Sequence, residues 1–202
     1  MGSKLIYKDV SDLVGNTPIV NLDSINSQLY IKLEGNNPTG AIKDRLALGL
    51  IEKYERLGKL VRGMTILGAS GGSFGCALAF YGKLRGYKVK VVVGDKMKKD
   101  KRDFLNFFGA EIINFPGSTI DGNDYCEELI KGYDSNEVIF LDQFHDWENV
   151  NIHFNKTGPE ILNDMPDLQA VVFAVGTGGS LYGISKYIKS NLKYHKKSKI
   201  NS

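Results

Sequence analysis

The stretch that decides the fold reads Lys32-Leu33-Glu34-Gly35-Asn36-Asn37-Pro38-Thr39-Gly40-Ala41-Ile42-Lys43-Asp44-Arg45. A short strand over residues 30–33 runs into a turn built from Gly, Asn, Pro and Thr. A helix is predicted to begin near Ala41, because apolar residues follow at helical spacing: Ile42, Leu46, Leu50 and Tyr54. Lys43 therefore falls in the first helical turn, where the helix dipole favours a neutral amine over an ammonium. Such an amine can act as nucleophile and base, whereas the plainer interpretation is a solvated surface lysine.

The composition limits the class of protein. The 202 residues are 42% apolar and 24% charged, which is typical of a globular chain with one large or two small domains. A net charge of +3 is too small to indicate a nucleic-acid partner. The chain shows no signal peptide and no apolar run of about 20 residues, so we expect no membrane association and a cytoplasmic location. Cys76 and Cys126 lie 50 residues apart, a spacing that predicts neither a disulfide framework nor a metal site.

Strands and helices alternate along most of the chain. An antiparallel hairpin is predicted from a strand ending near Leu22 and the strand before the lysine turn. Later strands are predicted at 64–67, 89–93, 111–115, 138–141 and 170–175, with helices between them. This alternation indicates an α/β fold with a parallel sheet. Asp121 or Asp124 is expected to cap the helix that contains Tyr125, Leu129 and Ile130.

Two glycine-rich turns each join a predicted strand to a predicted helix. The first is Gly68–Gly75, and the second is Gly176-Thr177-Gly178-Gly179-Ser180. Free backbone N–H groups in such turns bind anions, and the second turn suits a phosphate at a helix N-terminus. The first turn does not fit the dinucleotide fingerprint, and no Walker lysine follows the second, which excludes a P-loop.

The first turn also contains a Gly-x-Ser-x-Gly pattern, which is typical of serine hydrolases. It reads Gly68-Ala69-Ser70-Gly71-Gly72, between a strand and a helix as that fold requires. A hydrolase using Ser70 would need a histidine and an acid, such as His153 or His195 with Asp142. This alternative leaves the lysine segment and the second glycine turn unexplained.

Residues Glu34–Arg45 closely resemble the lysine segment of the pyridoxal-phosphate-dependent cysteine synthase and cystathionine β-synthase family, and Val14–Pro18 resembles its opening signature. The resemblance implies pyridoxal 5'-phosphate as the cofactor, with Lys43 forming the Schiff base. It also implies a tryptophan synthase β-like (type II) fold with two parallel-sheet subdomains. Residues 1–34 and 147–202 would form the larger, phosphate-binding domain, and residues 35–146 the smaller one.

The same resemblance implies the ligands of each group. Gly176, Thr177, Gly178, Gly179 and Ser180 would hold the cofactor phosphate. The substrate carboxylate would be held by the first turn and Gln143, with these turn residues: Ser70, Gly71, Gly72 and Ser73. Ser73 would also contact the cofactor's ring hydroxyl. The family usually has Thr-Ser-Gly-Asn-Thr-Gly where this chain has Ser70-Gly71-Gly72-Ser73-Phe74-Gly75, so Phe74 beside the substrate indicates a different amino acid.

The implied reaction is β-replacement or β-elimination on an activated serine-like amino acid, as in cysteine biosynthesis, with sulfide a candidate nucleophile. Family members continue past residue 202, so the resemblance indicates a C-terminally truncated chain with an incomplete second subdomain. We expect a homodimer or a complementing chain to cover the exposed sheet. The alternative is a catalytically impaired or regulatory relic of this fold.

Overall fold

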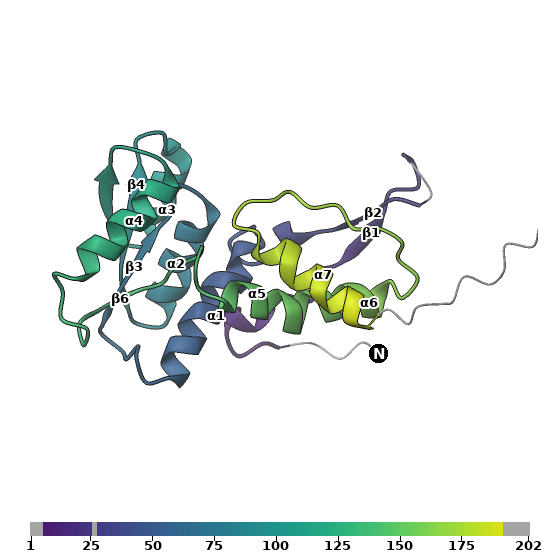
Figure 1. Ribbon diagram of the computed structural model, residues 1–202, viewed down its shortest axis with the longest axis horizontal. Helices are drawn as coiled ribbons and strands as arrows, with labels where there is room; N and C mark the ends of the chain where they lie inside the picture. Colours follow the sequence, from purple (N-terminus) through teal and green to yellow (C-terminus); the bar gives the residue numbers. More distant parts are fainter. Residues whose placement is uncertain (1–5, 26–27, 192–202) are drawn as a thin grey trace, which may run out of the picture. The chain divides into compact units, whose positions relative to one another are not determined.

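The computed structural model describes residues 6–25 and 28–191. The chain divides into two compact units, Met1–Asn149 and Val150–Ser202 (Figure 1). The grouping of residues 1–34 with 147–202, as opposed to 35–146, stays a prediction.

The first unit is built on a four-stranded parallel sheet in the order β5-β4-β3-β6. The strands are β3 (Thr65–Ala69), β4 (Lys88–Gly94), β5 (Glu111–Phe115) and β6 (Val138–Phe140). Every residue of the central strand β3 is buried, as its nearly continuous apolar sequence requires of a strand covered on both faces. The predicted parallel α/β sheet is therefore confirmed in this unit.

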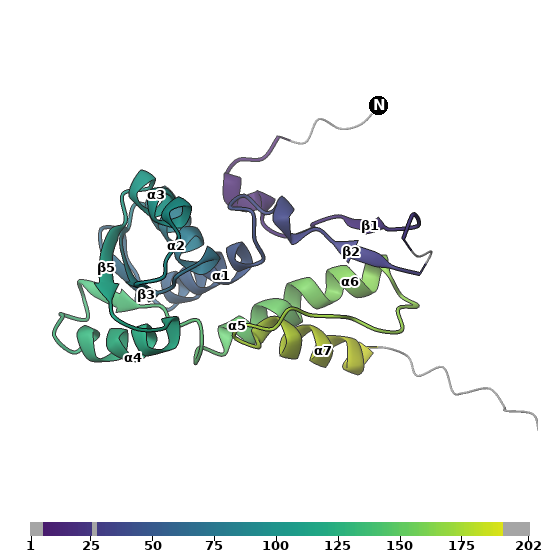
Figure 2. The same cartoon turned by 90° about the horizontal axis from the view of Figure 1, so that it is seen from above.

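Helices cover both faces of this sheet (Figure 2). The helices α2 (Ser73–Leu84) and α3 (Lys99–Phe107) lie on one face, and α1 (Lys43–Arg56) packs against α2. On the other face, α4 (Thr119–Ile130) packs on β3, β4 and β6. A buried cluster joins the sheet to α4: Leu67, Ala69, Val92, Cys126 and Val138. Both cysteines are buried and form no disulfide.

The segment before α1 forms the predicted hairpin and two 3-10 turns. The strands β1 (Ile19–Asn21) and β2 (Tyr30–Lys32) pair antiparallel, with η1 (Val10–Leu13) before them and η2 (Glu34–Asn36) after them. The helix α1 begins at Lys43, two residues later than predicted. The prediction that Asp121 or Asp124 caps α4 is wrong for the N-cap itself, although Asp121 takes part in the capping box. Ser118 is the N-cap, because its hydroxyl accepts from the Asp121 backbone N–H while the Asp121 carboxylate accepts from the Ser118 N–H.

The second unit is helical. The helix α5 (Glu148–Ile152) begins in the last two residues of the first unit. It leads into the π-helical turn η3 (His153–Thr157), which is followed by α6 (Gly158–Asp164) and α7 (Gly179–Asn191). The helices α6 and α7 pack through Ile161, Ile184 and Ile188. The predicted strand at 170–175 is wrong: these residues are irregular, and Val172 is 95% exposed. No described strand pairs with them, and a strand needs a partner for its backbone hydrogen bonds.

Across residues 6–25 and 28–191, every helix is too short or too polar to span a lipid bilayer.

Candidate active site

Lys43 is the first residue of α1, and its side chain is half-buried. Burial lowers the pKa of its amine from 10.5 to about 8. The direction agrees with the sequence-based expectation, and its cause is desolvation of the amine by burial. At pH 7 a pKa of about 8 leaves roughly a tenth of the amine neutral, against roughly 0.03% for an ordinary lysine. This chemistry suits a nucleophile or a base.

The turn that presents Lys43 is folded around the fully buried carboxylate of Asp44. One carboxylate oxygen accepts from the Thr39 backbone N–H at 3.0 Å and from the Tyr81 hydroxyl at 2.6 Å. The other accepts from the Thr39 hydroxyl at 2.7 Å and from the Ala41 N–H at 3.3 Å. Burying a carboxylate is costly unless hydrogen-bond donors surround it, and here the donors come from both the turn and α2. Asp44 thereby fixes the backbone on either side of Lys43.

Replacing Tyr81 with phenylalanine is expected to lower the free energy of unfolding by about 1.5–3 kcal/mol, because a buried carboxylate loses a donor that water cannot replace. Urea denaturation measures this loss. The matched control is Tyr87→Phe, which removes a hydroxyl bonded at 2.7 Å to Glu55, whose side chain is 26% exposed. The control is expected to cost about 1 kcal/mol or less, since water reaches its carboxylate. Equal losses in the two variants would contradict the prediction.

A second buried network ties the opening segment to the same turn. Arg45, 2% exposed, donates from Nε and Nη2 to the two carboxylate oxygens of Glu34, at 2.7 and 2.8 Å. The Thr17 hydroxyl and the Asn37 side-chain amide also donate to this carboxylate. Burial alone would raise the pKa of Glu34, but these donors and the Arg45 charge hold that pKa below its usual range. The two segments that carry the family resemblance are therefore joined in space, because Gly15 N–H also donates to the Asn37 side chain.

Ser70 and Gln143 meet at the carboxyl edge of the sheet. After β3 the chain crosses to β4 on one side, whereas β6 lies on the other side of β3. Ligands bind at such a point of reversal in open α/β sheets. The Gln143 side chain links the ends of β6 and β3 at this point, since its Nε2 donates to the Ala69 carbonyl at 2.8 Å, next to Ser70. The fold thus brings the predicted carboxylate-binding residues 70 and 143 together.

The rest of the first glycine turn opens α2. The Gly72 N–H donates to the Ser70 hydroxyl at 3.2 Å, Gly72 is the N-cap of α2, and Ser73 is its first residue. The residues Gly71, Gly72 and Ser73 are partly exposed, as a binding turn requires. Phe74 differs, because its side chain is 2% exposed and belongs to the hydrophobic core. We therefore place Phe74 in core packing rather than in contact with a substrate.

The second glycine turn, Gly176–Ser180, lies in the second unit. It precedes α7, whose first two residues are Gly179 and Ser180. Gly178 has a φ of +84°, a conformation that favours glycine. A Cβ at Gly176 or Gly178 would meet no atom within 4 Å. Open space before a helix N-terminus leaves room for an anion such as a phosphate.

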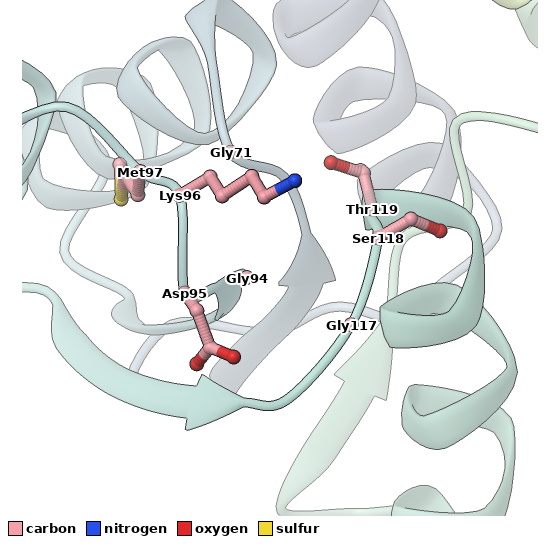
Figure 3. Close-up of a pocket in the computed structure, with 8 residues that line it drawn as sticks. All are labelled: Gly71, Gly94, Asp95, Lys96, Met97, Gly117, Ser118 and Thr119. Atoms are coloured by element: carbon pink, nitrogen blue, oxygen red, sulfur yellow. The ribbon is translucent and has the colours of Figure 1, made fainter.

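A cavity of about 490 Å³ opens at the same edge of the sheet as Ser70 (Figure 3). Segments at the ends of β3, β4 and β5 line it: Gly71, Gly94, Asp95, Lys96, Met97, Gly117, Ser118 and Thr119. Figure 3 shows the Lys96 amine reaching across it toward Thr119. A Cβ at Gly94 would lie 2.4 Å from the Gly117 carbonyl, so the two loops approach closely. This cavity was not predicted from the sequence. Each lining segment follows the carboxyl end of a strand, and that position is the signal by which it could have been predicted.

The residues proposed for a hydrolase have other partners. The Ser70 hydroxyl bonds within its own turn, to Gly72. His153 Nδ1 lies 2.9 Å from the Thr157 hydroxyl, and Asp142 lies 2.8 Å from His145 Nδ1. His195 is outside the described residues. A hydrolase requires the serine hydroxyl to bond to a histidine that in turn bonds to an acid. Ser70 instead bonds to Gly72, and Asp142 bonds to His145 and not to His153.

Comparison with known proteins shows which sequences this chain is similar to. Residues 10–200 match the family described as pyridoxal-phosphate dependent enzyme. The cysteine synthase of Flavobacterium sp. (strain K3-15) is 34% identical over 200 residues, which cover 93% of this chain and 63% of the relative. Cysteine synthase B of Salmonella typhimurium is 33% identical over 186 residues, which cover 89% and 61%. This chain therefore spans less than two thirds of the length of either relative.

Solved structures agree with the sequence comparison. The crystal structure of O-ureido-L-serine synthase matches with a TM-score of 0.85 and 32% identity, over 92% of this chain and 60% of that one. A hydrogen sulfide-producing enzyme from Fusobacterium nucleatum matches with a TM-score of 0.84 and 33% identity, over 93% and 63%. The predicted tryptophan synthase β-like (type II) α/β fold class is confirmed.

Proposed function

Since the chain belongs to the pyridoxal-phosphate dependent enzyme family, we propose that it supports β-replacement or β-elimination on an activated serine-like amino acid. The observation that carries this proposal is the half-buried Lys43 amine, with its pKa lowered to about 8, in a turn fixed by two buried networks. A solvated surface lysine would need neither the burial nor the networks.

In this proposed reaction, different residues of the chain would have different roles. Lys43 would bind the cofactor's aldehyde carbon through its amine and, once displaced by the substrate amine, would accept the substrate α-proton at Nζ. Pyridoxal phosphate, when bound, supplies an electron sink for the charge that this proton transfer leaves behind. Asp44 and the Arg45–Glu34 pair orient the turn that carries the amine.

The two glycine turns would bind the substrate carboxylate and the cofactor phosphate. Residues 70–73 and Gln143 would hold the substrate carboxylate at the point of reversal in the sheet, with Ser73 also at the cofactor's ring hydroxyl. The phosphate would lie at the second turn, with these residues as its ligands: Gly176, Thr177, Gly178, Gly179 and Ser180. The names of the relatives, cysteine synthase and O-ureido-L-serine synthase, support a serine-derived substrate.

We further propose sulfide as the nucleophile, which would place the reaction in cysteine biosynthesis, and a homodimer or a complementing chain as the assembly. The two buried, unpaired cysteines are compatible with the reducing cytoplasm that we propose as its location. A second candidate is a cofactor-binding relic without turnover. One observation favours it: Gly71 offers no hydroxyl to a substrate, and Phe74 is directed into the core.

The test adds pyridoxal phosphate to the purified 202-residue chain. We expect a yellow complex that borohydride traps on Lys43, as located by peptide mass mapping. Lys43→Ala is expected to abolish the specific adduct, while Lys59→Ala, at an exposed lysine, leaves it unchanged. The proposal would be contradicted if the label were spread over many lysines, or if labelling were unchanged in Lys43→Ala. Release of product from O-acetylserine and sulfide then separates an enzyme from a relic.

A further inference from the structure

Three ionisable side chains gather on the first unit, outside the proposed active site. Glu127 lies on α4, while Asp142 and His145 lie on the loop after β6. One ligand atom from each lies within 4.8 Å of the other two. His145 Nδ1 is 2.8 Å from an Asp142 oxygen and 3.6 Å from a Glu127 oxygen. Two carboxylates thus face one imidazole nitrogen, and a single proton on that nitrogen can bond well to only one of them.

A fourth polar group lies beside the three. Asn123 is 1% exposed, and neither its amide oxygen nor its amide nitrogen makes a hydrogen bond. The Asn123 amide lies near the Asp142 carboxylate. Asn123 precedes Glu127 by four residues on α4, so both side chains lie on one face of the helix. A buried amide without a hydrogen bond is rare in proteins, and a bound water or ion is one explanation for such a group.

We propose that Asn123, Glu127, Asp142 and His145 form a binding site for a divalent first-row transition ion such as Zn²⁺. Three oxygen donors and one imidazole nitrogen suit such an ion. Ligands at about 2.1 Å from one ion are separated by about 3.0–3.4 Å, and the two measured separations from His145 Nδ1, 2.8 and 3.6 Å, lie on either side of this range. The Asn123 amide oxygen would coordinate the ion, and the charge of the ion would offset the negative charges of the Glu127 and Asp142 carboxylates.

The site would link α4 to the loop that carries Gln143. The backbone N–H groups of Phe144 and His145 already donate to Asp142, at 2.6 and 3.1 Å, so the loop presents its ligands in a fixed turn. An ion bound there would restrain both segments and stabilise the folded chain by mass action. This inference does not depend on the proposed function.

The test titrates the full chain, free of tags and dialysed against chelator, with Zn²⁺ by calorimetry and with Co²⁺ by visible absorption. We expect one ion per chain with a Kd of about 10 µM or tighter, cobalt d–d bands, and a higher thermal midpoint. The exposed-ligand variants His145→Gln and Glu127→Gln should each weaken binding at least about tenfold. Asn123→Ala should also weaken binding, although it changes no charge.

Matched controls separate this site from adventitious binding. Glu128→Gln neutralises the neighbouring helix position, where the carboxylate pairs with Lys131, and His195→Gln removes another histidine. Both should bind like the unchanged chain. No saturable binding below about 1 mM would overturn the proposal. Equal affinities in His145→Gln and the unchanged chain would overturn it too.

Discussion

Arg45→Met is expected to destabilise the chain by about 3–5 kcal/mol, because it leaves the Glu34 carboxylate buried without its cation. The side chains of Arg45 and Glu34 are 1% and 17% exposed, so little water can replace the lost bonds. Typical domains are stable by about 5–15 kcal/mol, so this loss would unfold a large fraction of a marginal chain. Urea denaturation followed by circular dichroism measures it.

The same substitution at Arg85 provides the control. Arg85 pairs with Glu52 and Glu55, but all three side chains are between 26% and 38% exposed. Solvent screens such pairs, so Arg85→Met should cost about 1 kcal/mol or less. Comparable losses at Arg45 and Arg85 would show that burial of the pair has no special effect.

Acid distinguishes lost charge compensation from lost packing. In the unchanged chain the pKa of Glu34 is lowered, so its contribution to stability is complete above the usual value of 4.5 and is lost as the pH falls through the folded value. In Arg45→Met the dominant remaining effect on Glu34 is burial, which raises its pKa, so mild acid should reduce the difference between the two proteins. Adding Glu34→Gln to Arg45→Met should recover part of the loss. A difference that is independent of pH would assign the effect to packing.

The sequence predicted most of the first unit, because its signals are local. The glycine and proline turns, the continuous apolar strands and the helical spacing after Lys43 all depend on nearby residues. The strand predicted at 170–175 failed for the opposite reason. Apolar character is local, whereas a strand forms only beside a partner, and no described strand pairs with this segment.

In the candidate site too, local features could be predicted from the sequence and features that depend on distant residues could not. Lys43 and the glycine turns are visible in the sequence, since a turn before a helix is a local pattern. The networks around Asp44 and Glu34 are not, because their partners Tyr81 and Thr17 lie 37 and 17 residues away. The burial that lowers the pKa of Lys43 is likewise a property of the packed fold.

The reactivity of Lys43 should level off above a pH of about 8. With its pKa lowered to about 8, its neutral fraction at pH 7 is roughly 300 times that of an ordinary lysine amine at 10.5. Acylation by a small amine reagent, followed by peptide mass spectrometry, should rise about tenfold per pH unit below 8 and flatten above it. N-acetyl-lysine amide in the same tube should keep reacting faster up to about pH 10.5. A Lys43 profile parallel to that reference would contradict the lowered pKa.

Stability gives an independent measure of the same shift. A lysine whose pKa falls on folding binds fewer protons folded than unfolded between pH 8 and 10.5, so its burial penalty is full below this range and disappears as the pH rises through it. Lys43→Met carries no such penalty. It should therefore be more stable than the unchanged chain at pH 7, with the advantage shrinking toward pH 10.5. An advantage that stays constant would mean that the methionine acts through packing alone, whereas a shrinking one assigns it to the buried amine.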